Sequence, residues 1–381
     1  MSLRVLHTSD WHLGRALHEE SLLSDQAWVL DRLVEVMKDA RPDVVVVAGD
    51  IFERAVPPPE AVTLLDDALT RLAGLGVPTV VIAGNHDSAE RLTFGARLLS
   101  TRGIHLRGAL EDAHRPVEIP DKGFVYALPF VEPDVVRSLV GDEGIRGHAA
   151  ATERVLASVR MDAAKRALPT VLVAHSFIQG AKQTPDSERP IVGTAESVPL
   201  ATVAGFDYVA LGHLHAAQVL SDSVRYSGSL LKYSFSEATH RKGAVLVEVD
   251  RGRASAETVE LGARRDLARI RGTLQDLLTL PELERHCGDL VEATLDDRDY
   301  VVDAKRRLQA RFPHVLSVVR SELTFATAGT SFSRQVEGAG RDDELLFESF
   351  FRTVAGTDPQ PEQRAIFTEA LAAVERQERH S

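Results

Sequence analysis

Side chains that bind metals or move protons gather in five short segments of this 381-residue chain. Each segment directly follows a run of apolar, β-branched residues of the kind that forms a buried strand. The segments are Asp10-Trp11-His12, Gly49-Asp50, Gly84-Asn85-His86-Asp87, His175 and Gly212-His213-Leu214-His215. Ligands collect at the carboxyl ends of strands in open α/β sheets, so we expect these segments to meet in one site.

The chemistry of this set indicates a pair of divalent metals acting on a phosphodiester. It offers carboxylate, amide and imidazole groups but no thiolate, a combination that suits Mn, Fe or Zn. Two metals about 3.5–4 Å apart stabilise both the attacking and the leaving oxygen of an in-line displacement at phosphorus. Asp50 is the natural carboxylate to bridge such a pair. His86, between two ligand-like neighbours, is left to protonate the leaving oxygen.

The segments differ in how specifically each one indicates a metal site. Asp-x-His and Gly-Asp are common in solvated turns and carry little weight alone. The unbroken Asn85-His86-Asp87 is stronger, and so is the pair His213 and His215. Alternate side chains of an extended backbone point the same way, so both imidazoles can reach neighbouring metals. We expect ordinary core or surface imidazoles at three other histidines, His7, His18 and His105.

The ordered set resembles the calcineurin-like metallophosphoesterases, and within them the D subunits of bacterial SbcCD-type exonucleases. The closer likeness begins at Leu6–Gly14. It continues through Val47–Phe52, Ala83–Ser88, Ala210–His215, Arg225–Ser229 and Ser234–Glu237. It is clear up to about Asp250 and follows only the order of the elements beyond that residue.

The resemblance implies two metal ions, with Mn²⁺ the expected metal, and a role for each site residue. One metal would take Asp10, His12, Asp50 and His215, and the other Asp50, Asn85, His175 and His213. His86 would be the catalytic proton donor, and Asp87 would orient it. Archaeal and eukaryotic relatives have a second functional histidine where this chain has Glu53. The role of Glu53 is therefore open.

The resemblance also implies an α/β fold: a calcineurin-like two-sheet α/β sandwich with a smaller α+β capping domain and C-terminal helices. We expect a nuclease domain over 1–265, a capping domain over 266–325, a linker over 326–340 and a partner-binding segment over 341–381. Apolar spacing predicts helices at Leu22–Ala40, Pro59–Ala73, Ala89–Thr101, Val301–Phe312, Asp343–Ala355 and Pro361–Arg379. Strands are expected after residue 266 at Leu267–Arg271, Leu290–Leu295 and Val315–Arg320.

We therefore expect the nuclease subunit of an SbcCD-type complex, acting in DNA recombination, repair and replication. It would be a 3′–5′ exonuclease on duplex ends and an endonuclease on single strands or hairpins. ATP would be bound by an SbcC-type ATPase partner, because the chain lacks a Gly-x-x-x-x-Gly-Lys-Ser/Thr loop. Two alternatives stay open. One is a metallophosphoesterase acting on a small or non-nucleic-acid phosphodiester, and the other is a non-catalytic subunit that bridges DNA ends.

Two surfaces are candidates for protein partners. The leucines of Pro59–Ala73 and Ala89–Thr101 would form a homodimer, unless they only pack on the sheet. The apolar residues of the two C-terminal helices would bind the ATPase, unless these helices fold back on the capping domain.

The bulk composition limits the class of protein. A net charge of −12 argues against a simple cationic DNA-binding domain, although bound metals reverse the local field. No apolar stretch approaches the ~20 residues that span a bilayer, and no signal-peptide pattern is present. A single cysteine, Cys287, fits a reducing compartment. We therefore expect a cytoplasmic protein that contains no membrane segment.

Overall fold

The computed structural model describes residues 2–185, 197–297, 299–321, 343–355 and 357–378. The chain divides into two compact units, Met1–Val319 and Arg320–Ser381. The linker expected at 326–340 lies outside the described residues. None of the helices in the described ranges is long and apolar enough to cross a membrane.

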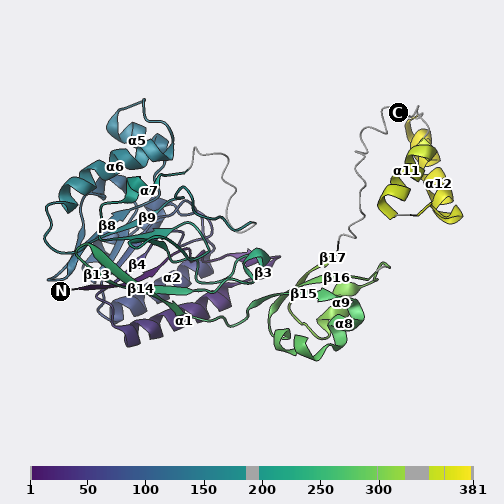
Figure 1. Ribbon diagram of the computed structural model, residues 1–381, viewed down its shortest axis with the longest axis horizontal. Coiled ribbons are helices and arrows are strands. Elements are labelled where there is room, and N and C mark those ends of the chain that lie inside the picture. The colour runs from purple at the N-terminus through teal and green to yellow at the C-terminus, as the bar shows by residue number, and fades with distance from the viewer. Residues whose placement is uncertain (1, 186–196, 298, 322–342, 356, 379–381) are drawn as a thin grey trace. The chain divides into compact units, whose positions relative to one another are not determined.

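Two six-stranded sheets pack face to face in the larger unit (Figure 1). The first has the order β14-β13-β1-β4-β5-β6, with β1 Leu3–Thr8, β4 Val44–Val47, β5 Thr79–Ile82, β6 Ile104–Arg107, β13 Gly243–Asp250 and β14 Arg253–Glu260. The second has the order β11-β12-β10-β9-β8-β7, with β7 Val117–Ile119, β8 Gly123–Leu128, β9 Thr170–His175, β10 Tyr208–Gly212, β11 Gln218–Ser221 and β12 Val224–Tyr226. In each sheet the four strands that include the site strands run parallel.

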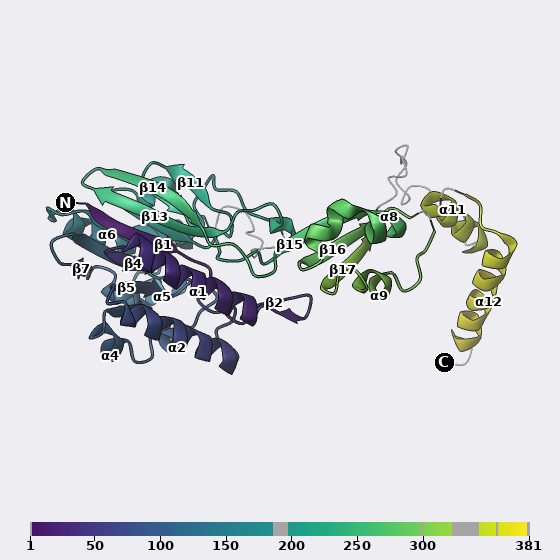
Figure 2. The ribbon, with the colours of Figure 1, turned by 90° about the horizontal axis from the view of Figure 1, so that it is seen from below.

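Both faces of the central strands are covered, which explains why β4 is apolar throughout. In β4, Val44 and Val46 face the other sheet, whereas Val45 and Val47 join the core on the outer face. Full burial of one such side chain contributes about 1.5–3 kcal/mol. The outer layers are α1 (Leu23–Ala40) and α2 (Pro59–Gly74) on the first sheet, and α5 (Pro133–Val140), α6 (Gly147–Ala163) and α7 (Leu200–Val203) on the second. The result is the expected two-sheet α/β sandwich (Figures 1 and 2).

The helix expected at Ala89–Thr101 is wrong as a single element. The chain forms two short helices there, α3 (Ala89–Leu92) and α4 (Ala96–Ser100). Gly95 separates them with a φ of 74°, in the left-handed region that ends a helix. The remaining short elements are β2 (Ala16–Leu17), β3 (Glu20–Ser21), η1 (Leu110–Asp112) and η2 (Phe235–Glu237).

A smaller three-stranded sheet follows residue 266. It consists of β15 (Leu267–Gly272), β16 (Leu290–Leu295) and β17 (Val315–Arg320), with α8 (Leu274–Thr279), η3 (Pro281–His286) and α9 (Ala304–Gln309) (Figure 2). The sheet and helices share a core that includes Leu277, Val291 and Phe312. The helix α9 is shorter than the expected Val301–Phe312, and it begins late because Asp303 precedes it with a left-handed φ of 54°. The domain boundary at residue 265 stays a prediction.

The second unit contains two helices that pack on each other, α11 (Asp343–Ala355) and α12 (Pro361–Glu378). The rings of Phe347 and Phe367 stack with centroids 4.2 Å apart. Glu348 pairs with Arg364 at 3.1 Å. Part of the apolar surface expected to be available to a partner therefore joins the two helices to each other.

Candidate metal centre

The seven expected ligands lie at the carboxyl ends of five strands drawn from both sheets. The first sheet supplies Asp10 and His12 after β1, Asp50 after β4 and Asn85 after β5, and the second supplies His175 at the end of β9 and His213 and His215 after β10. Five of the seven are almost fully buried, and Asn85 and His213 are partly buried. Ligand atoms of Asp10, His12 and His215 lie within 4.8 Å of one another, as do those of Asp10, Asp50 and His175.

The backbone at these positions is unusual. Four of the residues have a positive φ: Asp10 (53°), His12 (45°), Asp50 (50°) and His213 (110°). Such conformations cost about 1–3 kcal/mol each and cluster at functional sites. The turn at His213 corrects the expectation of an extended backbone. The imidazoles of His213 and His215 therefore reach different neighbours instead of pointing the same way.

Glycine is required beside the ligands because the loops approach closely. A Cβ on Gly84 would lie 2.1 Å from Oδ1 of Asp50. A Cβ on Gly49 would lie 2.4 Å from Nδ1 of His175. These glycines let the loops after β4 and β5 close over the site.

The ligand atoms form two groups. The first half-site comprises Asp10, His12 and His215, and the second comprises Asn85, His175 and His213. In the first, Nε2 of His12 and Nε2 of His215 are 3.0 Å apart. In the second, Oδ1 of Asn85 lies 2.9 Å from Nε2 of His175 and 3.1 Å from Nδ1 of His213.

Asp50 stands between the half-sites. Its Oδ2 is 3.7 Å from Nε2 of His12 and 3.4 Å from Nε2 of His175. Burial favours a raised pKa for Asp50, but the charge of His175 and its hydrogen bond to Asp50 hold that pKa well below its usual value. An ionised carboxylate in this position is suited to contact a cation in either half-site.

Two of the imidazoles have protonation states that fit divalent cations as they stand. Burial lowers the pKa of His215 and of His213 to about 3, so both rings are neutral. His175 differs, because against the effect of burial Asp50 and Asp10 raise its pKa to about 9, so a cation bound there would displace its proton. Nδ1 of His12 and Nδ1 of His215 each face a carboxylate, which places their protons there and leaves two Nε2 lone pairs facing each other. Burial, with Asp50 nearby, raises the pKa of Asp10 to about 8. A cation between these groups would accept both Nε2 lone pairs and would offset the repulsion between the Asp10 and Asp50 carboxylates. The residues therefore fit divalent metals.

His86 is placed beside the ligands with one ring nitrogen already engaged. Its backbone N–H donates to Oδ1 of Asp50 at 2.9 Å. Its Nδ1 is 2.9 Å from the backbone carbonyl of Glu53, which makes Nδ1–H the donor. Its Nε2 lies 4.0 Å from Oδ2 of Asp50. This ring can therefore present Nε2 to a substrate held at the two half-sites.

The expected role of Asp87 needs correction. Its carboxylate accepts hydrogen bonds from the backbone N–H groups of Ile51, Phe52 and Gly84, at 2.9–3.1 Å. The carbonyl of Glu53, and not Asp87, fixes the ring of His86. Asp87 instead joins the loop that carries Asp50 to the loop that carries Asn85.

Sequence reasoning missed two carboxylates behind the ligands. Oε2 of Glu53 lies 3.0 Å from Nδ1 of His12, and Oε1 of Glu237 lies 3.1 Å from Nδ1 of His215. In the sequence, Glu53 stands out only as a difference from relatives, and Glu237 only as part of a motif. His215 and Glu237 are far apart in sequence, so no local spacing signals their contact.

His7, His18 and His105 lie outside both half-sites, as expected. His7 is fully buried, and its ring lies 3.0 Å from the Tyr208 hydroxyl and 3.1 Å from the Leu211 carbonyl. His18 is exposed, and its ring lies 5.8 Å from that of Phe235. His105 is partly buried on β6.

Comparison with known proteins finds two family matches, one in the N-terminal and one in the C-terminal part of the sequence. Residues 3–217 match the family described as calcineurin-like phosphoesterase, and residues 263–374 match the type 5 capsule protein repressor C-terminal domain. The chain is 33% identical over 357 residues to the D subunit of the nuclease SbcCD from Staphylococcus saprophyticus, an alignment that spans 93% of this chain and 94% of that protein. Among solved structures, TT1561 of Thermus thermophilus matches 69% of this chain and 100% of its own, at 13% identity and a TM-score of 0.42.

Proposed function

Because this chain belongs to the calcineurin-like phosphoesterase family and is a relative of an SbcCD nuclease, we propose that it is a metal-dependent DNA nuclease subunit of an SbcCD-type complex. The observation that carries this proposal is the pair of half-sites joined by Asp50, with His86 beside them. That arrangement suits hydrolysis of a phosphodiester. The C-terminal match over residues 263–374 extends the likeness beyond the catalytic sandwich.

The residues divide the work of the reaction. When bound, the two metals would activate the attacking water and neutralise charge on the phosphate. Asp10, His12 and His215 would hold one metal, and Asn85, His175 and His213 the other, with Asp50 shared. His86, whose Nδ1–H is held by the Glu53 carbonyl, would pass a proton from Nε2 to the leaving oxygen. Asp87 would keep the loops of Asp50 and Asn85 in register.

The finer properties are also proposals. Mn²⁺ is the metal we propose, because the mixed oxygen and imidazole ligands suit Mn, Fe or Zn and the family resemblance favours Mn among these. The proposed reactions are 3′–5′ exonucleolytic removal from duplex ends and endonucleolytic cleavage of single strands and hairpins. The proposed place of action is the cytoplasm, where a bacterial DNA end-processing enzyme meets its substrate.

A cleavage assay tests this function. The purified chain would be given labelled duplex, hairpin and single-stranded DNA, and a small aryl phosphodiester, with each divalent metal in turn. We expect cleavage of DNA that requires metal, stops with a chelator and is stimulated on duplex ends by the ATPase partner and ATP. Hydrolysis of the small ester without cleavage of DNA would favour the alternative phosphoesterase. DNA binding without metal-dependent turnover would favour a bridging subunit.

We also propose that α11 and α12 bind the SbcC-type ATPase. Two short helices bury little surface by themselves. In this pair Ile366 is 68% exposed and Phe350 is half exposed, while Phe347 and Phe367 hold the helices together. An exposed apolar face on a self-associated helix pair is typical of an interaction site.

Truncation after Gly340 should separate the two activities. We expect the shortened chain to remain folded and to cleave single-stranded DNA with Mn²⁺, because its half-sites are intact. It should fail to co-purify with the ATPase and lose ATP-stimulated duplex cleavage. Ile366→Glu should weaken the complex while leaving the stacked phenylalanines in place. Full complex formation by the truncated chain would contradict the assignment.

A homodimer is proposed through a surface that keeps Leu98 from the leucines that the sequence suggests and adds two other exposed residues. Leu65, Leu69, Leu72 and Leu92 are buried and pack in the core of the first sheet. The exposed apolar residues of this region are Phe94 at 88%, Leu98 at 78% and Val62 at 47%. Exposed apolar residues gathered in one region mark protein interfaces.

Charge placed on this surface should give a monomer. We expect Phe94→Glu with Leu98→Glu to shift the sedimentation coefficient to that of one chain at micromolar concentration. The single-strand nuclease activity should remain, since neither residue touches a half-site. Val135→Glu, on the exposed side of α5, is the matched control and should keep the parental state. A monomeric parent would argue against the dimer.

A further inference from the structure

The two imidazoles of the first half-site each have a carboxylate behind them. Nδ1 of His215 lies 3.1 Å from Oε1 of Glu237, with hydrogen-bond geometry. Nδ1 of His12 lies 3.0 Å from Oε2 of Glu53, a close contact of ring and carboxylate without hydrogen-bond alignment. Each carboxylate has its own cation. Nζ of Lys242 is 2.5 Å from Oε2 of Glu237, and Arg15 is 3.2 Å from Oε2 of Glu53.

The second half-site is built differently. Nδ1 of His175 lies 2.8 Å from a neutral acceptor, the backbone carbonyl of Ala48. Nε2 of His213 is buried and has no hydrogen-bond partner within the described ranges. Among the residues that the structure describes, a carboxylate therefore stands behind both imidazoles of the first half-site and behind neither imidazole of the second.

Lys242 extends the contact of Glu237 to the backbone. Its buried ammonium donates to the carbonyl of His215 at 2.7 Å and to the Ser229 hydroxyl at 2.8 Å. The lysine and the glutamate therefore fix the main chain and the ring of His215 together. Replacing a buried ion pair with apolar residues is often neutral or stabilising. Stability alone thus gives no reason for a charged pair here.

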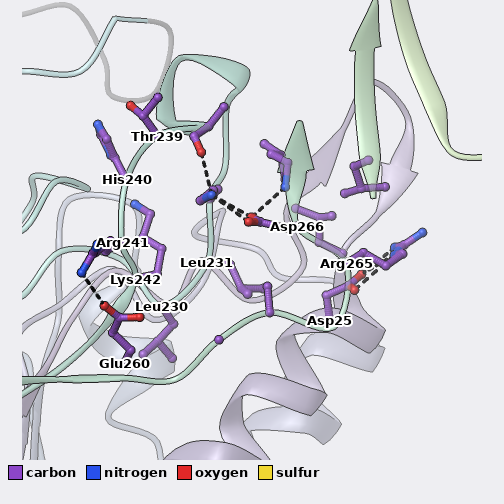
Figure 3. Close-up of a pocket in the computed structure, with 17 residues that line it drawn as sticks. Asp25, Leu230, Leu231, Thr239, His240, Arg241, Lys242, Glu260, Arg265 and Asp266 are labelled. Carbon is purple, nitrogen blue, oxygen red and sulfur yellow. Dashed lines mark hydrogen bonds and ion pairs between the residues drawn. The ribbon is translucent and has the colours of Figure 1, made fainter. Parts of the chain in front are cut away.

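Lys242 also lines a cavity of about 260 Å³, whose wall includes an unrelated ion pair (Figure 3). Figure 3 shows Arg241 joined to Glu260 beside Lys242. The Arg241 guanidinium is 3.2 Å from Oε1 of Glu260. Their side chains are largely exposed. Glu260 thus offers a carboxylate from the same region whose ion pair, among the described residues, is with Arg241 and not with a proposed ligand.

We propose that Glu237 and Glu53 are positioning residues that make the first half-site the tighter of the two metal positions. A carboxylate that accepts Nδ1–H fixes the tautomer, aims Nε2 at the metal and raises its basicity. Loss of such a partner typically lowers metal affinity about 10–100-fold. The inference rests on the proposed two-metal function and assigns a different metal affinity to each of the two positions.

Calorimetric titration of Mn²⁺ into the metal-free full chain, without DNA, tests this asymmetry. The parent should show one tighter and one weaker position. Glu237→Gln and Glu53→Gln should each weaken the tighter position about 10–100-fold and leave the weaker one unchanged. Glu260→Gln should leave both unchanged. Parental affinities in both glutamine variants, or equal weakening of the two positions, would overturn the inference.

A second variant separates positioning from folding, because Glu237→Gln leaves the Lys242 charge buried without its carboxylate. The double variant Glu237→Gln with Lys242→Met removes both charges. We expect it to recover the melting temperature of the metal-free parent but not its tighter affinity. Recovery of both the melting temperature and the tighter affinity would mean that the Glu237–Lys242 pair has only a structural role. A parent that takes up no metal would overturn the proposed function itself, whereas a parent with two equal positions would overturn only this inference.

Discussion

Replacing Asp50 with alanine should remove metal from both half-sites and abolish hydrolysis. Oδ2 of Asp50 is 3.4 Å from Nε2 of His175 and 3.7 Å from Nε2 of His12, so one carboxylate is within reach of both positions. Its Oδ1 also accepts the backbone N–H of His86. A bound metal supplies several kcal/mol of transition-state stabilisation. Since 1.36 kcal/mol is a factor of ten in rate, we expect a loss of at least about 10³-fold.

Metal content by mass spectrometry and the DNA cleavage rate measure this effect. Asp43→Ala is the matched control, because Asp43 lies at the opposite end of β4 and pairs with Lys122. It should keep both metals and the parental rate. Parental metal content in Asp50→Ala would show that this carboxylate does not bridge the half-sites.

Replacing His86 with serine should leave both metals bound and lower the cleavage rate about 10²–10⁴-fold, the range typical of general acid catalysis. Its Nδ1 is engaged by the Glu53 carbonyl, and its Nε2 is the nitrogen that remains for the leaving oxygen. The defect should shrink on a nitrophenyl phosphodiester, because that leaving group departs without a proton.

The same variant distinguishes a proton donor from a ligand. Nitrogen and oxygen atoms of His12, Asp50 and His86 are close enough to hold a metal together. Loss of metal from His86→Ser would therefore assign His86 to the ligand set. A parental rate on DNA at saturating Mn²⁺ would remove it from the mechanism. His105→Ser, on β6, is the control for loss of a partly buried imidazole and should behave as the parent.

The positions of the site strands could be predicted from sequence because burial on both faces leaves a clear pattern. The run Val44–Val47 has only apolar residues, and the first polar side chain after it is Asp50. The pairing of strands could not be derived in this way. β1 pairs with β13, more than two hundred residues later, and nothing local records that contact. The division into two sheets came from the family resemblance.

The roles of individual side chains were harder to predict than their presence. Asp87 follows His86 directly, so adjacency suggested that it orients the ring. The fold instead directs its oxygens to the backbone of Ile51, Phe52 and Gly84. Likewise, Gly95 is a readable signal for a break between α3 and α4, but the leucine spacing around it favoured a single helix. Contacts between loops depend on the tertiary structure and leave no spacing in the chain.

The supply of ligands from both sheets links metal binding to the integrity of the sandwich. Each half-site takes ligands from both sheets, so the two sheets must be docked before either half-site is complete. The unfolded chain therefore has no comparable affinity, and bound metal stabilises the native state by mass action. When the free metal concentration is one hundred times the dissociation constant of a single site, binding adds about 2.7 kcal/mol to the free energy of unfolding. Bound ions would thus act as reversible cross-links between the sheets, and any fluctuation that separates the sheets there would first have to release them.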